Sequence, residues 1–212
     1  RQRLFDYPPL SEEEAKRGVI GIPRVLNMYE NYPFWATFFR ELGFRVVLSP
    51  FSTRKIYELG MESIPSESEC YPAKLSHGHV QWLIDQGIKT IFHPCVFYEH
   101  QETKQAQNHY NCPIVVSYAE NLKNNVEAIS DGDVHYIRPF IAFTSEKTAA
   151  DRLVKTAAEE WGIPAKEVRA AVHKAWEEQL NAKADIRVEG LKRLTEMEKA
   201  GGRGVVLDRK SV

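Results

Sequence analysis

Apolar and polar segments alternate along the first 140 residues with the spacing expected of strands and helices. Short apolar runs with Gly or Pro on at least one side are typical of buried strands, and they lie at 18–23, 44–49, 89–94 and 113–118. Residues 27–43 instead repeat apolar side chains at helical spacing and stop at Gly43. This alternation predicts a parallel sheet covered by helices on both faces.

Further helices are expected from polar and periodic segments at 52–60, 73–87 and 98–110. The first of these ends at Gly60 and the second at Gly87. Pro72 suits the first turn of the second helix, because its missing N–H is one that a helix leaves unpaired there. The stretch 62–65 is expected to form a very short strand.

Beyond residue 140 the pattern changes to long helices. Ser145 lies three residues before Thr148 and is a candidate N-cap, although the acidic residue of a full capping box is missing. Apolar residues at helical spacing predict one long helix, or a pair, that ends at Gly201 and Gly202. The fold class is therefore α/β, a Rossmann-like parallel sheet flanked by helices with a helical C-terminal segment.

The pattern divides the chain into four parts. Residues 1–17 are polar with two prolines and are interpreted as a linker or arm. Residues 18–140 form the expected Rossmann-like α/β domain, and 141–203 form the helical segment. Residues 204–212 open with a short apolar run and are interpreted as the start of a truncated second α/β unit. Since the first residue is not Met, a fragment of a longer protein is expected.

Composition changes this picture mainly by exclusion. With 28 basic and 29 acidic residues the formal charge is −1, which gives no reason to expect nucleic acid or an anionic membrane as partner. No apolar run approaches the roughly 18–20 residues of a membrane span. No glycine-rich phosphate-binding motif is present, so nucleotide binding has no motif support. Three cysteines fit a reducing cytoplasm better than a disulfide scaffold.

The predicted topology sorts the three cysteines. In an open parallel sheet, ligands bind outside the carboxyl ends of the strands. Cys70 precedes a helix that leads into the strand at 89–94, and Cys95 follows that strand, so both are expected at the carboxyl edge. Cys112 precedes the predicted strand 113–118, which places it at the opposite edge, roughly 16 Å away. Cys70 and Cys95 are therefore a candidate pair of metal ligands, without Cys112.

Other polar residues are expected near the same edge. His77, His79 and His93 are candidate ligands or hydrogen-bond donors, and Lys74 is placed to offset the charge of an anionic cluster. Arg24 follows the first strand, where it could meet a phosphate or carboxylate. Each residue also has an ordinary interpretation, as a packed cysteine, a helix histidine or a surface arginine. The cysteine spacing is not a ligand signature of the C-x-x-C kind.

Four stretches of the sequence resemble a known family. They are "IGIPRVLNMYENYPFWATFFRELGFRVVLSP", "IPSESECYPAKLSHGH", "IFHPCVFYE" and "NHYNCPIVVSYAENLKNN". They are similar to the domain that follows the ATPase modules in large CoA-substrate-specific enzyme activases, the activators of 2-hydroxyglutaryl-CoA dehydratase. The likeness covers residues 1–140 closely and the helical region more loosely.

The resemblance implies a role and partners that composition does not give. It implies a module of an ATP-dependent electron-transfer activase in the cytoplasm. Its partners would be a 2-hydroxyacyl-CoA dehydratase and the ATPase modules of the same full-length chain, with a homodimer as a further expectation. ATP hydrolysis, and one iron–sulfur cluster, belong to those ATPase modules, so an enzymatic activity of this chain alone is not implied.

The family is itself similar to the dehydratase subunits, which carry a [4Fe–4S] cluster on cysteines. The matching positions are Cys70 in "CYPAK" and Cys95 in "HPC", with Lys74 and His93 beside the cluster. In the dehydratases a further ligand comes from a later unit, whereas this sequence has no cysteine after Cys112. The family's Gly-Arg-Pro-Tyr-His stretch is also replaced by "DRKSV".

Two other function classes stay open. One is a docking module without a cluster, which predicts an exposed apolar patch and buried, unligated cysteines. The other is an acyl-CoA or nucleotide-binding enzyme domain that uses Arg24 and helix N-termini as an anion site.

Overall fold

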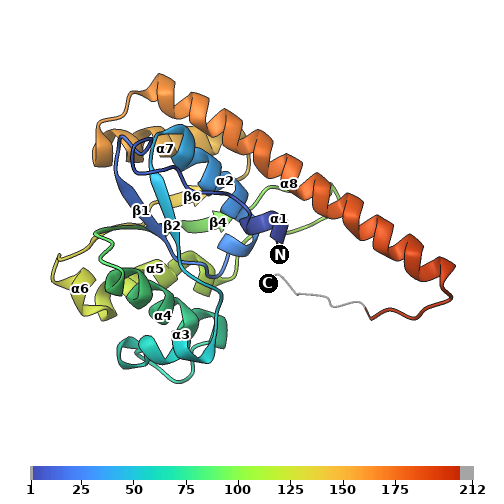
Figure 1. Cartoon of the computed structure of the whole chain (residues 1–212), viewed down its shortest axis with the longest axis horizontal. Helices are drawn as coiled ribbons and strands as arrows, with labels where there is room; N and C mark the ends of the chain where they lie inside the picture. Colours follow the sequence, from blue (N-terminus) through green and yellow to red (C-terminus); the bar gives the residue numbers. More distant parts are fainter. Residues whose placement is uncertain (1, 206–212) are drawn as a thin grey trace.

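The computed structural model describes residues 2–205, which form a parallel sheet with helices on both faces (Figure 1). The sheet has the strand order β2-β1-β3-β5, where the strands are β1 (Val19–Ile22), β2 (Arg45–Leu48), β3 (Thr90–Phe92) and β5 (His135–Ile137). Every pairing is parallel, with Ile20 beside Val46 and Ile91 beside Tyr136. The predicted α/β class is confirmed.

A second, two-stranded parallel sheet continues from the first. Its strands are β4 (Cys95–Tyr98) and β6 (Phe140–Ala142). The Cys95 N–H donates to the carbonyl of Pro139, and the His93 N–H donates to that of Ile137. The ends of β3 and β5 therefore run on together into β4 and β6, which carries the chain past the carboxyl edge of the main sheet.

Two groups of helices cover the two faces of the sheet (Figure 1). One face carries α2 (Met28–Glu41), α7 (Glu146–Trp161) and α8 (Ala165–Lys199), with the short α1 (Gln2–Phe5) beside them. The other carries α3 (Arg54–Leu59), a 3-10 turn (Met61–Ser63), α4 (Tyr71–Asp85), α5 (Pro113–Asn125) and α6 (Glu127–Ser130).

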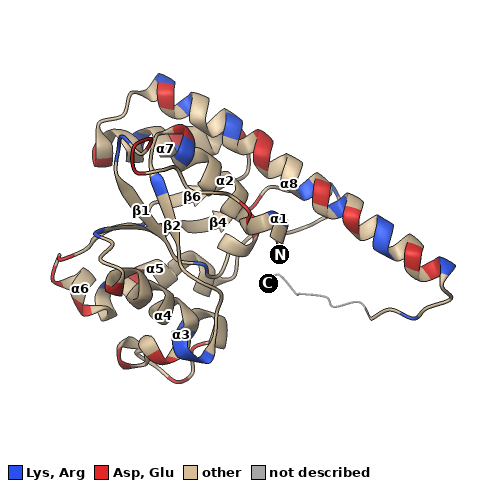
Figure 2. Ribbon diagram, in the orientation of Figure 1, with Lys and Arg blue, Asp and Glu red and all other residues tan. Residues whose placement is uncertain are grey.

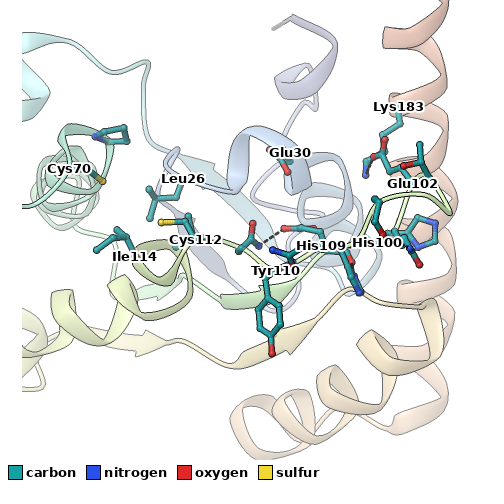
Figure 3. A pocket seen from close by; sticks show the side chains of 18 residues that line it. Leu26, Glu30, Cys70, His100, Glu102, His109, Tyr110, Cys112, Ile114 and Lys183 are labelled. Carbon is teal, nitrogen blue, oxygen red and sulfur yellow. Dashed lines mark hydrogen bonds and ion pairs between the residues drawn. The ribbon is translucent and has the colours of Figure 1, made fainter. Parts of the chain in front are cut away.

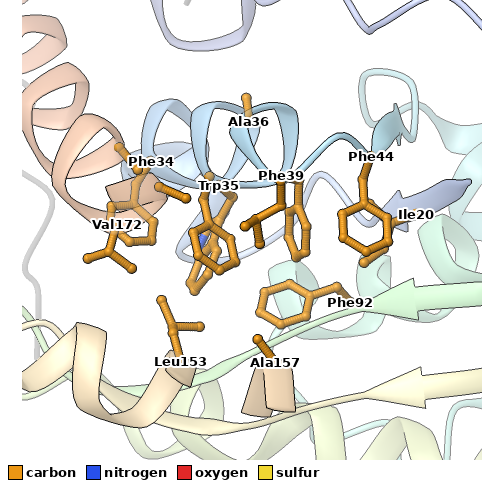
Figure 4. Packing of buried hydrophobic residues seen from close by; sticks show 14 of the residues in the cluster. Ile20, Phe34, Trp35, Ala36, Phe39, Phe44, Phe92, Leu153, Ala157 and Val172 are labelled. Atoms are coloured by element: carbon orange, nitrogen blue, oxygen red, sulfur yellow. The ribbon is translucent and has the colours of Figure 1, made fainter. Parts of the chain in front are cut away.

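The face under α2 is closed by aromatic side chains (Figure 4). Trp35 and Phe39 are fully buried, and their ring centroids lie 4.8 and 4.9 Å from that of Phe92 on β3. Leu153 of α7 and Val172 of α8 complete the cluster. Such tilted and edge-to-face contacts are favourable beyond the apolar area they bury, so this face is the main core of the molecule.

The segment 2–17 lies along α2 and α8. Arg3 forms ion pairs with Glu178 and Asp185 of α8, both at 2.7 Å. The ring of Phe5 packs 5.2 Å from that of Tyr32 in α2. These contacts attach the N-terminal segment to the helical face.

Three elements differ from their predictions. The predicted strand 113–118 is the start of α5, because Pro113 opens a helix and the buried side chains continue at helical spacing to Leu122. The predicted helix 98–110 is a loop after β4, whose ends pair as Tyr98 with Tyr110. The predicted strand at 62–65 is the end of a 3-10 turn.

The C-terminal helices follow the prediction more closely. The Ser145 hydroxyl accepts a hydrogen bond from the Thr148 N–H at 3.1 Å, which confirms the N-cap. The predicted long helix is the single helix α8 of 35 residues. The predicted second unit at 204–212 lies mostly outside the described residues, and 204–205 form neither helix nor strand. Within residues 2–205, no helix has the length and apolarity to cross a membrane.

Candidate functional site

A pocket of about 450 Å³ lies between the N-termini of α4 and α5, the loop after β4 and the middle of α8 (Figure 3). Cys70, Cys112 and Leu26 line one end of it. His100 and Lys183 line the other end. The pocket therefore joins the carboxyl side of the sheet to the long C-terminal helix.

Cys70 and Cys112 occupy equivalent places in the fold. Cys70 is the N-cap residue of α4 and Cys112 that of α5, and each is followed within two residues by a proline in the first turn. Neither forms a disulfide. The prediction that Cys112 lies at the opposite edge of the sheet is wrong, because the segment after it is a helix rather than a strand. The structure thus brings Cys70 and Cys112 to one pocket.

Cys95 lies apart from this pocket, at the start of β4. Its side chain is completely buried, in an apolar cluster that also contains Ala73 and Tyr136. Burial raises the pKa of the Cys95 thiol to about 12. The role predicted for Cys95 as a metal ligand beside Cys70 stays a prediction.

A half-buried carboxylate, that of Glu99, forms the wall of the pocket next to Cys112. Glu99 accepts hydrogen bonds from the Asn31 amide at 3.0 and 3.2 Å and from the Asn111 amide at 2.8 Å. Burial raises the pKa of Glu99, although both amide hydrogen bonds oppose the shift. The sequence pattern alone does not reveal this group, because the polar stretch around Glu99 predicts a helix.

The three candidate histidines are buried and paired with hydroxyl groups. His77 contacts Ser63 and Tyr118 at 2.7 and 3.0 Å, His79 contacts Ser49 and Ser52 at 2.8 and 2.9 Å, and His93 contacts Tyr136 at 2.8 Å. Burial lowers the pKa of each imidazole to about 4, so all three are neutral at pH 7. None of them lines the pocket.

Arg24 lies at the carboxyl end of β1, as predicted. Its guanidinium stacks between the rings of Phe5 and Phe51, at 4.5 and 4.0 Å, and its Nε donates to the Ser49 carbonyl at 2.9 Å. Its Nη1 is buried and has no hydrogen-bond partner among the described residues. Arg24 lines a smaller pocket of about 190 Å³ that shares Leu26 with the larger one.

Lys74 lies in the first turn of α4, four residues after Cys70. Its ammonium donates to the carbonyl of Glu67 at 3.1 Å. The roles predicted for Lys74, Arg24 and His93 beside a cofactor stay predictions. Within residues 2–205, no three His, Cys, Asp or Glu side chains are grouped so that they could hold a metal ion.

The sequence did contain a signal for Cys112. "ECYP" and "NCP" both place a cysteine just before a proline that opens a helix. Reading the two stretches as the same local structure would have placed both thiols at helix N-termini.

Residues 19–208 match a protein-family model described as a CoA enzyme activase uncharacterised domain. The match covers all strands of both sheets and every helix but α1. No curated protein and no solved structure matches the chain.

Proposed function

Because the chain belongs to the family of this CoA enzyme activase domain, we propose that it is a module of an ATP-dependent activator of a 2-hydroxyacyl-CoA dehydratase. An activase domain implies an enzyme partner in general. The dehydratase as that partner, and ATP hydrolysis by other modules of the same protein, are the specific part of the proposal. The observation that carries it is the pocket that presents the Cys70 and Cys112 thiols together.

The cofactor proposed for this module is an iron–sulfur cluster. A [4Fe–4S] cluster takes four ligands, which are usually cysteine thiolates. Cys70 and Cys112 supply two thiols at helix N-termini, where the positive end of the helix dipole favours an anionic ligand. Cys95 is fully buried outside this pocket, so it is the less suitable partner for Cys70. The chain therefore fits half of a cluster site, and the other ligands would come from another unit.

When bound, such a cluster supplies one-electron transfer. The residues of this chain then have simpler tasks. Cys70 and Cys112 would hold one side of the cluster, and Lys74 would place a positive charge in the first turn of α4. The proposal places the protein in the reducing cytoplasm, where free thiols persist.

A docking module without a cluster is the second candidate function. It is favoured by exposed apolar side chains on the outer half of α8. Val188 is 67 % exposed, Leu191 60 % and Leu194 54 %. Apolar groups on a projecting helix are typical of surfaces that bind another protein.

Anaerobic reconstitution separates the two functions. The intact protein is loaded with iron and sulfide, and iron content and the EPR spectrum of the reduced sample are compared for wild type, Cys70→Ala and Cys112→Ala. Both variants are expected to lose the same part of the iron and of the spectrum. Cys95→Ser is the matched control, because Cys95 lies outside the pocket, and it is expected to keep that part.

The cluster of the ATPase modules adds the same iron and the same EPR signal to every sample. Comparing each variant with wild type therefore cancels that contribution. Unchanged iron in both pocket variants would contradict the cluster and leave the docking module. Loss of iron in the Cys95 variant and not in the Cys112 variant would restore the pairing of Cys70 with Cys95.

A further inference from the structure

A side chain of α8 is inserted into the backbone of α2. Gln179 is buried, its Oε1 accepts from the Phe34 N–H at 3.1 Å, and its Nε2 donates to the Glu30 carbonyl at 2.6 Å. Phe34 and Glu30 are four residues apart, so they are the two groups that a regular helix would pair. Pro33 lies between them and disturbs the helix there. The Gln179 side chain therefore takes the place of one backbone hydrogen bond of α2, with a hydrogen bond to each of its two groups.

From this bridge a row of polar groups leads to the pocket. The Gln179 amide lies 3.5 Å from the Asn31 side-chain oxygen, and Asn31 donates to both carboxylate oxygens of Glu99. Glu99 also accepts from Asn111, the residue before Cys112. The row Gln179–Asn31–Glu99–Asn111 thus connects the middle of α8 to the backbone that carries the Cys112 thiol.

The backbone next to Cys112 is held by further contacts. The Asn111 side chain donates to the Val96 carbonyl, and its N–H donates to the Phe97 carbonyl, both at 3.0 Å. One turn beyond Gln179, Lys183 forms an ion pair with Glu102 of the same loop at 2.7 Å. The loop between β4 and α5 is therefore attached both to β4 and to α8.

Gln179 and Asn31 of this row are buried and Glu99 and Asn111 are half-buried, so the row is costly to desolvate. The raised pKa of Glu99 reflects a carboxylate that loses more to desolvation than its amide partners return. Apolar side chains of similar volume would pack here at lower cost. A buried polar group of this kind contributes a defined geometry rather than stability.

We propose that this row is a positioning device, in which the placement of α8 sets the position and exposure of the Cys112 thiol. The outer half of α8 extends away from the body of the molecule and carries alternating positive and negative side chains (Figure 2). A displacement of that half would reach Gln179 along the helix and Cys112 through Asn31, Glu99 and Asn111. The device acts whether or not a cluster binds.

Alkylation rates of the thiols test the device. The iron-free, reduced intact protein is treated with iodoacetamide, and the modification of Cys112 and Cys70 is followed by mass spectrometry of their peptides. Gln179→Leu removes the inserted amide and keeps a side chain of similar size. It is expected to speed the alkylation of Cys112 about fivefold, the effect of losing about 1 kcal/mol of hydrogen bonding, and to leave Cys70 unchanged.

Thr156→Val is the matched control. Among the described residues, the buried Thr156 hydroxyl of α7 bonds only to the Arg152 carbonyl of its own helix, so Thr156→Val removes a hydrogen bond without touching the row. Thr156→Val is expected to leave the alkylation rates of both Cys70 and Cys112 unchanged. Equal acceleration of Cys70 and Cys112 by Gln179→Leu, or no acceleration, would overturn the proposal.

A surface variant keeps the test decisive if Gln179→Leu fails to fold. Lys183→Gln breaks the ion pair to Glu102 without disturbing a buried group. This variant is expected to raise the alkylation rate of Cys112 about twofold, because an exposed ion pair contributes only a few tenths of a kcal/mol. An unchanged Cys112 rate in this variant would likewise overturn the proposal. Because the thiols are free of iron, no outcome depends on the cluster.

Discussion

The two faces of the sheet are closed in different ways. Under α2 the cluster is built from large apolar rings, and Trp35 alone has the rings of Phe34, Phe92 and Phe143 within 4.8 to 5.5 Å. Under α4 and α5 the apolar residues are smaller, and three buried histidines lie beside hydroxyl groups. The first face depends on packing, whereas the second also depends on the protonation of its imidazoles.

The face with the buried histidines is also the face that carries the pocket. His79 bonds to Ser49, whose hydroxyl also accepts from the Arg24 N–H at 2.8 Å, so the imidazole fixes the turn after β1. His77 bonds to Tyr118 and thereby joins α4 to α5, the two helices that carry the pocket thiols. The face with buried polar pairs is the face that holds the site. Specific hydrogen bonds set geometry there, at the cost of sensitivity to acid.

The largest effect expected from this difference is a loss of stability in mild acid. His77, His79 and His93 have a pKa of about 4 in the folded state against about 6.5 unfolded, so the unfolded chain binds more protons between these values. The contribution of the neutral imidazoles to the free energy of unfolding is therefore complete above pH 6.5 and is lost as the pH falls toward 4. From pH 6.5 to 5 each histidine costs about 1.5 kcal/mol, up to about 5 kcal/mol in all. Urea unfolding at several pH values measures it.

A variant assigns this slope to the histidines. His93→Gln is expected to be less stable at pH 7 but to lose about a third of the dependence between pH 6.5 and 5. A slope that is the same in wild type and in His93→Gln would show that the His93 imidazole does not cause it.

The second effect compares the same substitution on the two faces. Trp35 is fully buried under α2, whereas Trp82 of α4 is only partly buried against the other cluster. Trp35→Ala is expected to lower the free energy of unfolding by about 3–5 kcal/mol, because it leaves a large cavity. Trp82→Ala should cost less than half as much. Equal losses in thermal or urea unfolding would mean that the two faces carry similar packing energy.

The smallest effect concerns the close contact of α3 with α4. A Cβ atom at Gly78 would overlap with the Ile56 carbonyl of α3, so Gly78→Ala forces the two helices apart. A loss of about 1–3 kcal/mol is expected. Gly190→Ala on α8 is the matched control, because nothing lies within 4 Å of its added methyl, and it should gain about 0.5–1 kcal/mol. A tolerated Gly78→Ala in urea unfolding would contradict this tight packing.

Much of the fold could be predicted because its patterns were long or clearly bounded. The helix at 28–41 repeats its aromatic residues over several turns, and Gly87 closes α4. The run "PIVVSY" was different, since its β-branched residues favour a strand while Pro113 favours a helix start. A run of six residues gives no period that decides between the two. The strands β5 and β6 have three residues each and left no signal at all.

The candidate site was predicted only in part, for a related reason. Cys70 was placed correctly because Pro72 marked its helix. The position predicted for Cys112, at the opposite edge of the sheet, is wrong because the segment after it forms the helix α5 and not a strand. Glu99, Asn111 and Gln179 were missed because their partners lie 12 to 149 residues away along the chain. No local pattern encodes such pairs.

The bridge between Gln179 and α2 also has a consequence during synthesis. Phe34 and Gln179 are 145 residues apart, so α2 leaves the ribosome long before the side chain that completes it. At roughly 5–20 residues per second, that interval is about 7 to 30 s. For that time the nascent chain carries the aromatic rings of α2 without the cover of α7 and α8. We expect this interval to be the one in which the newly made protein is most dependent on chaperones.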